Sequence, residues 1–380
     1  MPTPHTFLAQ FAHRVWQRKG LISTLLLPLS WLVLAAVFIK RRRHTHVAAH
    51  HTHCIPIIIV GNIMVGGTGK TPVVIGLVNT LKALGRRPGV ISRGYGVALP
   101  EQQARVGKGK LDPSLFGDEP ALIAQATGVP IAVHPKRRLA LQYLIERHPD
   151  IDIVVSDDGL QHLALPRDIE IVVQDERGLG NERVLPAGPL REHPSRLKNV
   201  DLIVLHQSGP TPQEGSLPQT QGIAPRTPAP QVAQIRMRLQ PISCTQLSTG
   251  QVVSWSEWLN QHRGESLGAI AAIGQPARFF GLLRQHGLNP DPALALPDHA
   301  ADITSAVHEV KQAIVLVTDK DAVKLQDTSD PRVWSVQVAP RFSDPHWVQA
   351  LLKRLQSNPA PGQLSLIHIS EPTRLLSTSY

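Results

Sequence analysis

The sequence is poor in cysteine and in aromatic residues. Its two cysteines, Cys54 and Cys244, lie far apart and match no metal-binding or redox spacing, which argues against a disulfide framework and is typical of a reducing compartment. Aromatic residues make up only 4% of the chain, and no basic stripe interleaves with them, so we expect no nucleic-acid partner. Acidic residues are scarce relative to basic ones. The net charge of +10 favours a membrane surface or a phosphorylated substrate as the anionic partner.

One apolar run, Leu21–Ile39, contains no charged residue and is followed at once by the basic cluster Lys40–Arg43. As a helix it would be about 28 Å long, close to the thickness of the hydrocarbon core of a bilayer. A cleavable signal peptide fits less well, because no small-residue cleavage site precedes the basic cluster. Pro28 is expected to kink the helix, so a spanning, a re-entrant and a monotopic anchor all stay open. We predict an N-terminal membrane helix.

A glycine-rich segment follows the apolar stretch Ile57–Val60 and ends in Gly69-Lys70-Thr71. A strand, a glycine-rich turn and a helix N-terminus, in this order, bind a nucleoside triphosphate because backbone N–H groups close around its phosphates. The spacing departs from the usual P-loop, since Met64 stands where its first glycine belongs. We predict that this loop binds ATP or GTP, with Lys70 reaching the β- and γ-phosphates and Thr71 binding Mg²⁺. The predicted nucleotide-binding residues are Gly66, Gly67, Thr68, Gly69, Lys70 and Thr71.

The rest of the chain alternates apolar strands with helix-like stretches, which predicts an α/β fold. Continuous Val/Ile runs, such as Ile151–Ser156 and Ile169–Gln174, indicate strands buried on both faces of a parallel sheet. The runs Val232–Leu239 and Gln251–Trp255 are β-like and predict a ribbon that joins two domains. We therefore divide the chain into an anchor, a P-loop domain, a ribbon or hinge, a smaller α/β domain and a non-native or disordered tail. Their ranges are 1–45, 46–230, 231–260, 261–358 and 359–380.

Two acidic residues, Asp157 and Asp158, end the apolar strand Ile151–Ser156. P-loop folds commonly hold Mg²⁺ or its waters with acidic residues at such a position, opposite the phosphates. A strand-ending turn with a helix cap is the alternative. We predict that both carboxylates belong to a magnesium site.

A third acidic residue, Asp118, stands in the segment Gly117-Asp118-Glu119-Pro120 at the start of a predicted helix. An Asp in this position is commonly a helix N-cap, and the local pattern alone leaves that possibility open. A kinase needs a base that accepts the proton of the attacking hydroxyl, and a carboxylate in a loop at a strand end is a candidate. The local pattern therefore leaves both roles open for Asp118.

Together these segments resemble the tetraacyldisaccharide 4′-kinase family, which phosphorylates the lipid A precursor of Gram-negative bacteria. The resemblance covers roughly residues 8 to 355 and rests on motifs in a fixed order. They are VGNIMVGGTGKTP, SRGYG (Ser92–Gly96), GDEP (Gly117–Pro120), DDGLQH (Asp157–His162), LPAGPLRE (Leu185–Glu192), Pro297-Asp298-His299 and the segment Thr318–Lys324.

The resemblance implies a kinase that transfers the γ-phosphate of ATP to the 4′-hydroxyl of the tetraacyldisaccharide 1-phosphate, giving lipid IVA, with Mg²⁺ as cofactor. It implies Lys70 and Asp118 as catalytic residues, and His299 as a partner of Asp118 from the second domain. Glu192 would be a further Mg²⁺-site residue. The resemblance also implies an enzyme that binds the lipids of the inner membrane. Because ATP is cytosolic, both domains should lie on the cytoplasmic face of that membrane. We expect a monomer.

One other class of function stays open from the sequence, a membrane-associated P-loop ATPase that acts as an assembly or partitioning switch. Such proteins carry a lysine just before Gly-Gly in the loop, where this sequence has Val65. The final segment, Leu364–Tyr380, resembles translated sequencing-adapter sequence, and we assign it no function.

Overall fold

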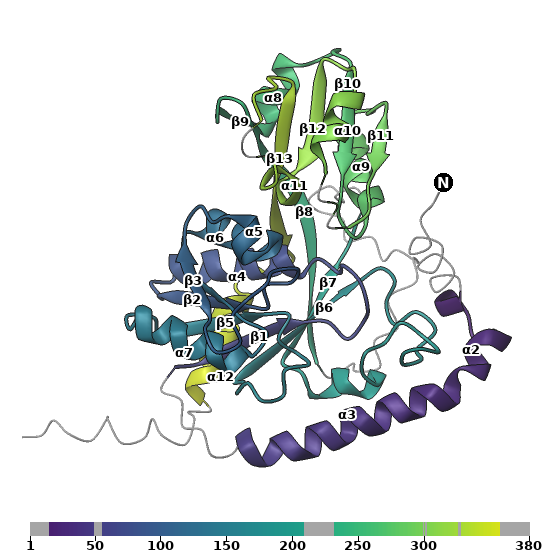
Figure 1. Ribbon diagram of the computed structural model, residues 1–380, viewed down its shortest axis with the longest axis vertical. Coiled ribbons are helices and arrows are strands. Elements are labelled where there is room, and N and C mark those ends of the chain that lie inside the picture. The colour runs from purple at the N-terminus through teal and green to yellow at the C-terminus, as the bar shows by residue number, and fades with distance from the viewer. Residues whose placement is uncertain are drawn as a thin grey trace, which may run out of the picture.

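A computed structural model describes residues 15–48, 55–208, 232–298, 300, 302–325 and 328–357. It shows a large lobe and a small lobe joined by two long strands (Figure 1). The predicted tail, residues 359–380, lies outside the described residues, as does His299.

The large lobe is built on a sheet whose central strands are buried on both faces. Its strands are β1 (Ile57–Gly61), β2 (Pro88–Ser92), β3 (Arg105–Lys108), β4 (Pro130–Val133), β5 (Ile153–Asp157), β6 (Ile169–Asp175) and β7 (Leu202–His206). They follow the order β3-β4-β2-β5-β1-β6-β7. Every neighbouring pair is parallel except β3 with β4. The predicted parallel sheet is therefore confirmed, and the antiparallel edge strand β3 is the difference.

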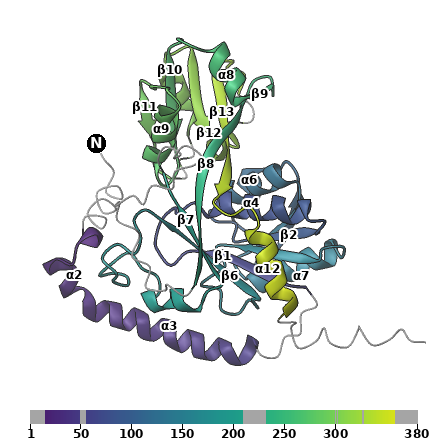
Figure 2. The ribbon, with the colours of Figure 1, turned by 180° about the vertical axis from the view of Figure 1, so that it is seen from behind.

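Helices cover both faces of this sheet, because alternate residues of each strand point to opposite sides. Ile58 and Val60 of β1 belong to one apolar core, whereas Ile57 and Ile59 belong to the other. The helices of the large lobe are α4 (Lys70–Ala83), α5 (Pro113–Phe116), α6 (Asp118–Thr127), α7 (Arg137–Arg147), the short 3₁₀ helix η1 (Pro194–Asn199) and α12 (Trp347–Ser357). The last of these, α12, follows the small lobe in the sequence and packs on the large lobe beside α4 (Figure 2).

The small lobe continues the same sheet. Its strands are β9 (Val252–Ser254), β10 (Leu267–Ala271), β11 (Ala293–Ala295) and β12 (Ile314–Thr318). Its helices are α8 (Trp255–Gln261), α9 (Pro276–Gln285), α10 (Thr304–Glu309) and α11 (Asp319–Ala322). The strands β11, β10 and β12 are parallel neighbours, and β12 in turn pairs with β13 (Val333–Phe342).

Two long strands, β8 (Ala233–Gln246) and β13, connect the lobes. The first residues of β8 pair in parallel with β7 of the large lobe, and the rest pairs antiparallel with β13. The run Gln251–Trp255 forms only the short β9 beside β8. The two predicted runs therefore do pair, but β8 pairs over a longer stretch with β13, which periodicity does not reveal because the paired segments lie about 100 residues apart.

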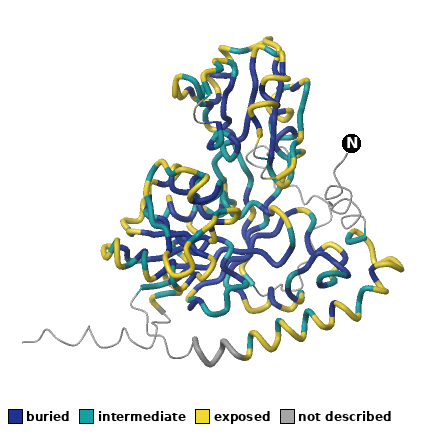
Figure 3. The backbone as a smooth tube through the Cα atoms, in the orientation of Figure 1, coloured by how far each residue is buried: buried dark blue, intermediate teal, exposed yellow. Residues whose placement is uncertain are grey.

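The N-terminal apolar run forms two helices, α2 (Leu21–Leu25) and α3 (Leu27–Ala48), instead of one. The break lies beside Pro28, whose ring and missing N–H oppose a continuous helix. Among the described residues, none of the helices combines the length and apolar character needed to cross a bilayer. The helices lie along the large lobe, and much of α3 is exposed (Figure 3).

Hydrogen bonds from small side chains hold these two helices to the loop after β6. Ser23 donates its hydroxyl to the Ala187 carbonyl at 2.6 Å, and Ser30 donates to the Val184 carbonyl at 2.8 Å. Both serines are buried. This loop continues into Glu192, so the same loop contacts the N-terminal helices and carries a candidate site residue.

Candidate active site between the lobes

The glycine-rich loop runs from the end of β1 to the first residue of α4. Gly66 and Gly69 adopt positive φ angles of 97° and 92°, a backbone conformation that other residues rarely adopt. The Asn62 amide donates to the Gly66 carbonyl and to the Thr68 hydroxyl, each at 3.2 Å. Thr71 follows Lys70 in the first turn of α4. The structure therefore contains the predicted glycine-rich turn between β1 and the first turn of α4.

Neighbouring strands pack closely against this loop. A Cβ atom on Gly69 would lie 2.4 Å from Nδ1 of His206, at the end of β7, so only glycine fits there. The same Nδ1 lies 3.0 Å from the Thr68 carbonyl oxygen. On another side, Met64 forms an isolated bridge with Leu190. These contacts fix the course of the loop before any ligand binds.

Lys70 meets the acidic strand end that the sequence singled out. Its Nζ lies 3.3 Å from Oδ1 of Asp158, and Arg191 Nη1 lies 3.6 Å from the other carboxylate oxygen. Asp157, at the end of β5, is buried and accepts a hydrogen bond from the Ser92 hydroxyl at 3.1 Å. The predicted proximity of the loop and this strand end is therefore present in the structure.

The pKa values of the two neighbouring carboxyl groups shift in opposite directions. Burial, together with the negative charges of Glu119 and Asp158, raises the pKa of Asp157 above its ordinary value. Burial would also raise the pKa of Asp158, but the charges of Lys70 and Arg191 outweigh it and lower that pKa. At neutral pH Asp158 is therefore ionised. A cation beside Asp157 would stabilise its charged form, which burial disfavours.

Asp157 and Asp158 could hold a magnesium ion. Oδ1 of Asp157 is buried and, within the described part of the chain, has no hydrogen-bond partner. No group of three or more metal-binding side chains occurs in those same residues. Since Mg²⁺ is usually bound by one or two carboxylates together with substrate phosphates, the two Asp side chains and the Thr71 hydroxyl are a suitable donor set.

Glu192 is linked to this pair through two intervening side chains. Its Oε1 accepts a hydrogen bond from the Gln161 amide at 3.0 Å, and its Oε2 lies 3.5 Å from Arg196 Nε. Gln161 in turn accepts a hydrogen bond from Arg191, which lies beside Asp158. The structure therefore connects Glu192 to Asp158 through Gln161 and Arg191.

Asp118 is the first residue of α6, and Gly117 is the N-cap. A side chain of the small lobe reaches Asp118, with Lys324 Nζ at 3.0 Å from its Oδ2. Next to it, Lys320 lies 3.3 Å from Glu119 and 3.2 Å from Asp298. These ion pairs bring the Gly117–Pro120 segment against the small lobe.

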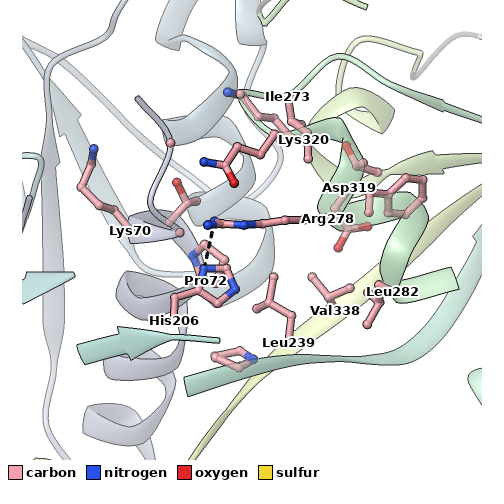
Figure 4. A pocket seen from close by; sticks show the side chains of 18 of the residues that line it. Lys70, Pro72, His206, Leu239, Ile273, Arg278, Leu282, Asp319, Lys320 and Val338 are labelled. Carbon is pink, nitrogen blue, oxygen red and sulfur yellow. Dashed lines mark hydrogen bonds between the residues drawn. The ribbon is translucent and has the colours of Figure 1, made fainter. Parts of the chain in front are cut away.

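A cavity of about 280 Å³ lies between the lobes. The phosphate-loop residues 67–71 line one wall, and apolar side chains of the small lobe, among them Ile273, Phe279 and Leu282, line another. Figure 4 shows Lys70 from the large lobe and Arg278 and Lys320 from the small lobe around it. The cavity therefore has the glycine-rich loop on one side and an apolar surface on another.

Several residues of the site were not predicted. Asp175 ends β6 just as Asp157 ends β5, and that shared signal was available in the sequence. Lys320 and Lys324 stand in a segment that the family resemblance included, but no role was assigned to them. Their partners in α6 lie about 200 residues away in the chain, so spacing alone does not reveal these contacts.

Comparison with known proteins identifies the family. A family model described as tetraacyldisaccharide-1-P 4′-kinase matches residues 22–356. A tetraacyldisaccharide 4′-kinase of Bordetella petrii is 46% identical over 359 residues, covering 92% of this chain and 98% of the relative. One of Bordetella parapertussis is 48% identical over 353 residues, with the same shares covered. This chain belongs to the tetraacyldisaccharide 4′-kinase family. The family predicted from the sequence motifs is confirmed.

The fold is also similar to a solved structure of this family. That structure is the "apo" form of LpxK from Aquifex aeolicus in complex with ATP. The TM-score is 0.70, at 23% sequence identity, with 88% of this chain and 99% of the other covered. The comparison supports the α/β fold with its large mixed sheet.

Proposed function

We propose that this protein transfers the γ-phosphate of ATP to the 4′-hydroxyl of the tetraacyldisaccharide 1-phosphate precursor of lipid A. The observation that carries the proposal is the contact of Lys70, which lines the interlobe cavity, with Asp158. The family match over residues 22–356 supplies the acceptor. A phosphate cradle, an acidic pair and a separate carboxylate are the groups that phosphoryl transfer requires.

ATP would lie with its phosphates on residues 66–71 and its nucleoside toward the apolar wall of the cavity. Lys70 and the backbone N–H groups of the loop would neutralise and orient the phosphates. Thr71, Asp157 and Asp158 would hold Mg²⁺, and Glu192 would support them through Gln161. When bound, the ion supplies positive charge to the phosphate oxygens during transfer.

Asp118 is the proposed general base. It begins α6, which packs against α4, the helix that follows the phosphate loop. Its carboxylate would accept the proton of the attacking hydroxyl, with Lys324 holding it in place at 3.0 Å. The proposed partnership with His299 concerns a residue outside those that the structure describes.

The proposal divides the work between the two lobes. Residues 46–230 would bind the phosphates, and residues 261–358 without α12, which packs on the large lobe, would close over the nucleotide, with β8 and the later strand β13 as the hinge. The pairing of β8 with both β7 and β13 supports a hinge at this place. Closure excludes water from phosphoryl chemistry, which favours transfer to a hydroxyl over hydrolysis.

The N-terminal helices would attach the enzyme to the inner membrane, with both lobes on the cytoplasmic face. Leu25, Leu29 and Leu32 have exposed fractions of 78%, 54% and 70%. The basic cluster Lys40–Arg43 follows on α3 and suits anionic headgroups. An attached enzyme meets an acceptor that resides in the same bilayer, and we expect a monomer to suffice.

Incubation with γ-labelled ATP and a detergent-dispersed acceptor tests the proposed function. The expected result is label on the lipid, with transfer reduced by orders of magnitude in Lys70→Ala. Label released as inorganic phosphate, at a rate indifferent to the acceptor, would instead favour a P-loop ATPase switch. Lys82→Ala, a change to another lysine of α4, is the matched control and should keep the normal rate.

A further inference from the structure

A buried carboxylate, Asp175, joins the two lobes. It stands at the end of β6, and its side chain is 0% exposed. From the large lobe, Arg177 Nη2 lies 2.7 Å from Oδ2, and Arg177 Nε donates to both carboxylate oxygens at 3.1 and 2.9 Å. From α9 of the small lobe, Arg278 Nη2 lies 2.8 Å from the same Oδ2. One carboxylate thus binds two guanidinium groups that belong to different lobes.

Arg177 also contacts the phosphate loop. Its Nη2 donates to the Gly67 carbonyl at 3.1 Å, and a Cβ atom on Gly66 would lie 3.2 Å from its Nη1. The small lobe approaches the same point directly, since a Cβ atom on Gly274 would lie 3.4 Å from the Gly67 nitrogen. The course of the loop at Gly67 therefore depends on where Arg177 is held.

The charges of this cluster favour the closed arrangement. Burial would raise the pKa of Asp175, but the hydrogen bonds and charges of Arg177 and Arg278 lower it below its ordinary value. The carboxylate is therefore ionised, and in the closed arrangement it accepts charge-assisted hydrogen bonds from both lobes. If the lobes separated, Asp175 would lose Arg278 and the Gln275 amide, which lies 3.4 Å from its Oδ2, and would keep Arg177.

We propose that Asp175 is a positioning residue that couples closure of the small lobe to the conformation of the phosphate loop. Arg278 docks on Asp175 as the lobes meet, and Asp175 holds Arg177 against the Gly67 carbonyl. This coupling rests on the proposed function, because it concerns the loop that would bind ATP. It makes ATP affinity depend on a residue of the small lobe that acts through another side chain.

A double-mutant cycle with Arg177→Gln and Arg278→Gln tests the coupling. Both side chains are partly exposed, at 25% and 18%, so the variants avoid the buried charge that Asp175→Asn would disturb. Each single variant should raise the KM for ATP about tenfold, within the usual range of coupling between sites. The KM for the lipid acceptor should stay unchanged. The double variant should have the same KM for ATP as the single variant with the higher KM.

Multiplied effects in the double variant would overturn the proposal, because Arg278 would then act on ATP independently of Arg177. Arg284→Gln, on the exposed side of the same helix, is the matched control and should keep the wild-type KM. Lys70→Ala separates the coupling from the proposed function. Normal turnover in that variant contradicts the proposed function, whereas multiplied effects beside an inactive Lys70→Ala contradict only the coupling.

Discussion

Asp118 begins α6 and binds Lys324 across the lobes, while Gly117 occupies the N-cap position. Asp118→Asn keeps the size of the side chain but removes the basicity that accepts a hydroxyl proton. We expect kcat to fall by about 10²–10⁴-fold, the usual contribution of a general base, with ATP binding intact. Steady-state kinetics and nucleotide titration check this. Asp112→Asn, at the N-cap of α5, should leave kcat normal; an equal loss there would contradict the special role of Asp118.

Asp319 gives a residue-scale prediction about pH. Burial raises its pKa to about 6, although Ser335 and the Val338 backbone donate hydrogen bonds to it. The folded state therefore keeps this proton to a higher pH than the unfolded chain, whose ordinary value is 3.8. Stability should fall as the pH rises from about 4 to about 6, by about 2–3 kcal/mol from this group.

Denaturant unfolding at a series of pH values measures this effect. In Asp319→Asn the fall between pH 4 and 6 should be smaller by the stated amount, because the amide does not titrate. Glu309→Gln, an exposed substitution in the same lobe, should retain the wild-type fall. A pH profile of Asp319→Asn that matches the wild type would remove Asp319 as its cause.

At the scale of elements, strands buried on both faces were predictable because their continuous Val/Ile runs are typical of the centre of a parallel sheet. The short strands β3 (Arg105–Lys108) and β11 (Ala293–Ala295) were not, since neither carries a long apolar run. The phosphate loop and the Asp157 strand end could be placed together, because both stand at carboxyl ends of adjacent parallel strands. The contacts of Lys324 with Asp118 and of Arg278 with Asp175 could not be predicted, because they depend on how β8 and β13 join the lobes.

The paired helices α2 and α3 carry an element-scale prediction. Their serines dock on the large lobe, whereas Leu25, Leu29 and Leu32 are exposed. Replacing these three leucines by Gln should weaken binding to vesicles that contain anionic lipid by at least about tenfold, since burying one such side chain contributes about 1.5–3 kcal/mol. Vesicle sedimentation measures this binding. Leu115→Gln, at another exposed leucine, should bind normally; normal binding by the triple variant would move the attachment elsewhere.

At the scale of the whole molecule, three ion pairs connect the lobes. They are Lys324 with Asp118, Lys320 with Glu119, and Arg278 with Asp175. A ligand held by both lobes should therefore stabilise them jointly. At a concentration of 100 Kd, ATP should raise the free energy of unfolding by about 2.7 kcal/mol. Thermal melting with and without Mg²⁺ and ATP measures this. Lys70→Ala should show little rise at the same ATP concentration, and an undiminished rise would place ATP elsewhere.

The whole molecule, in the function proposed for it, transfers phosphate from the interlobe site to one hydroxyl of the lipid acceptor. The most direct measurement compares the wild-type protein on two acceptors, the tetraacyldisaccharide 1-phosphate and its analogue without the 4′-hydroxyl, with γ-labelled ATP. We expect label on the first lipid and none on the second. Equal labelling of both lipids, or release of label to water at the same rate with either, would contradict the proposed transfer.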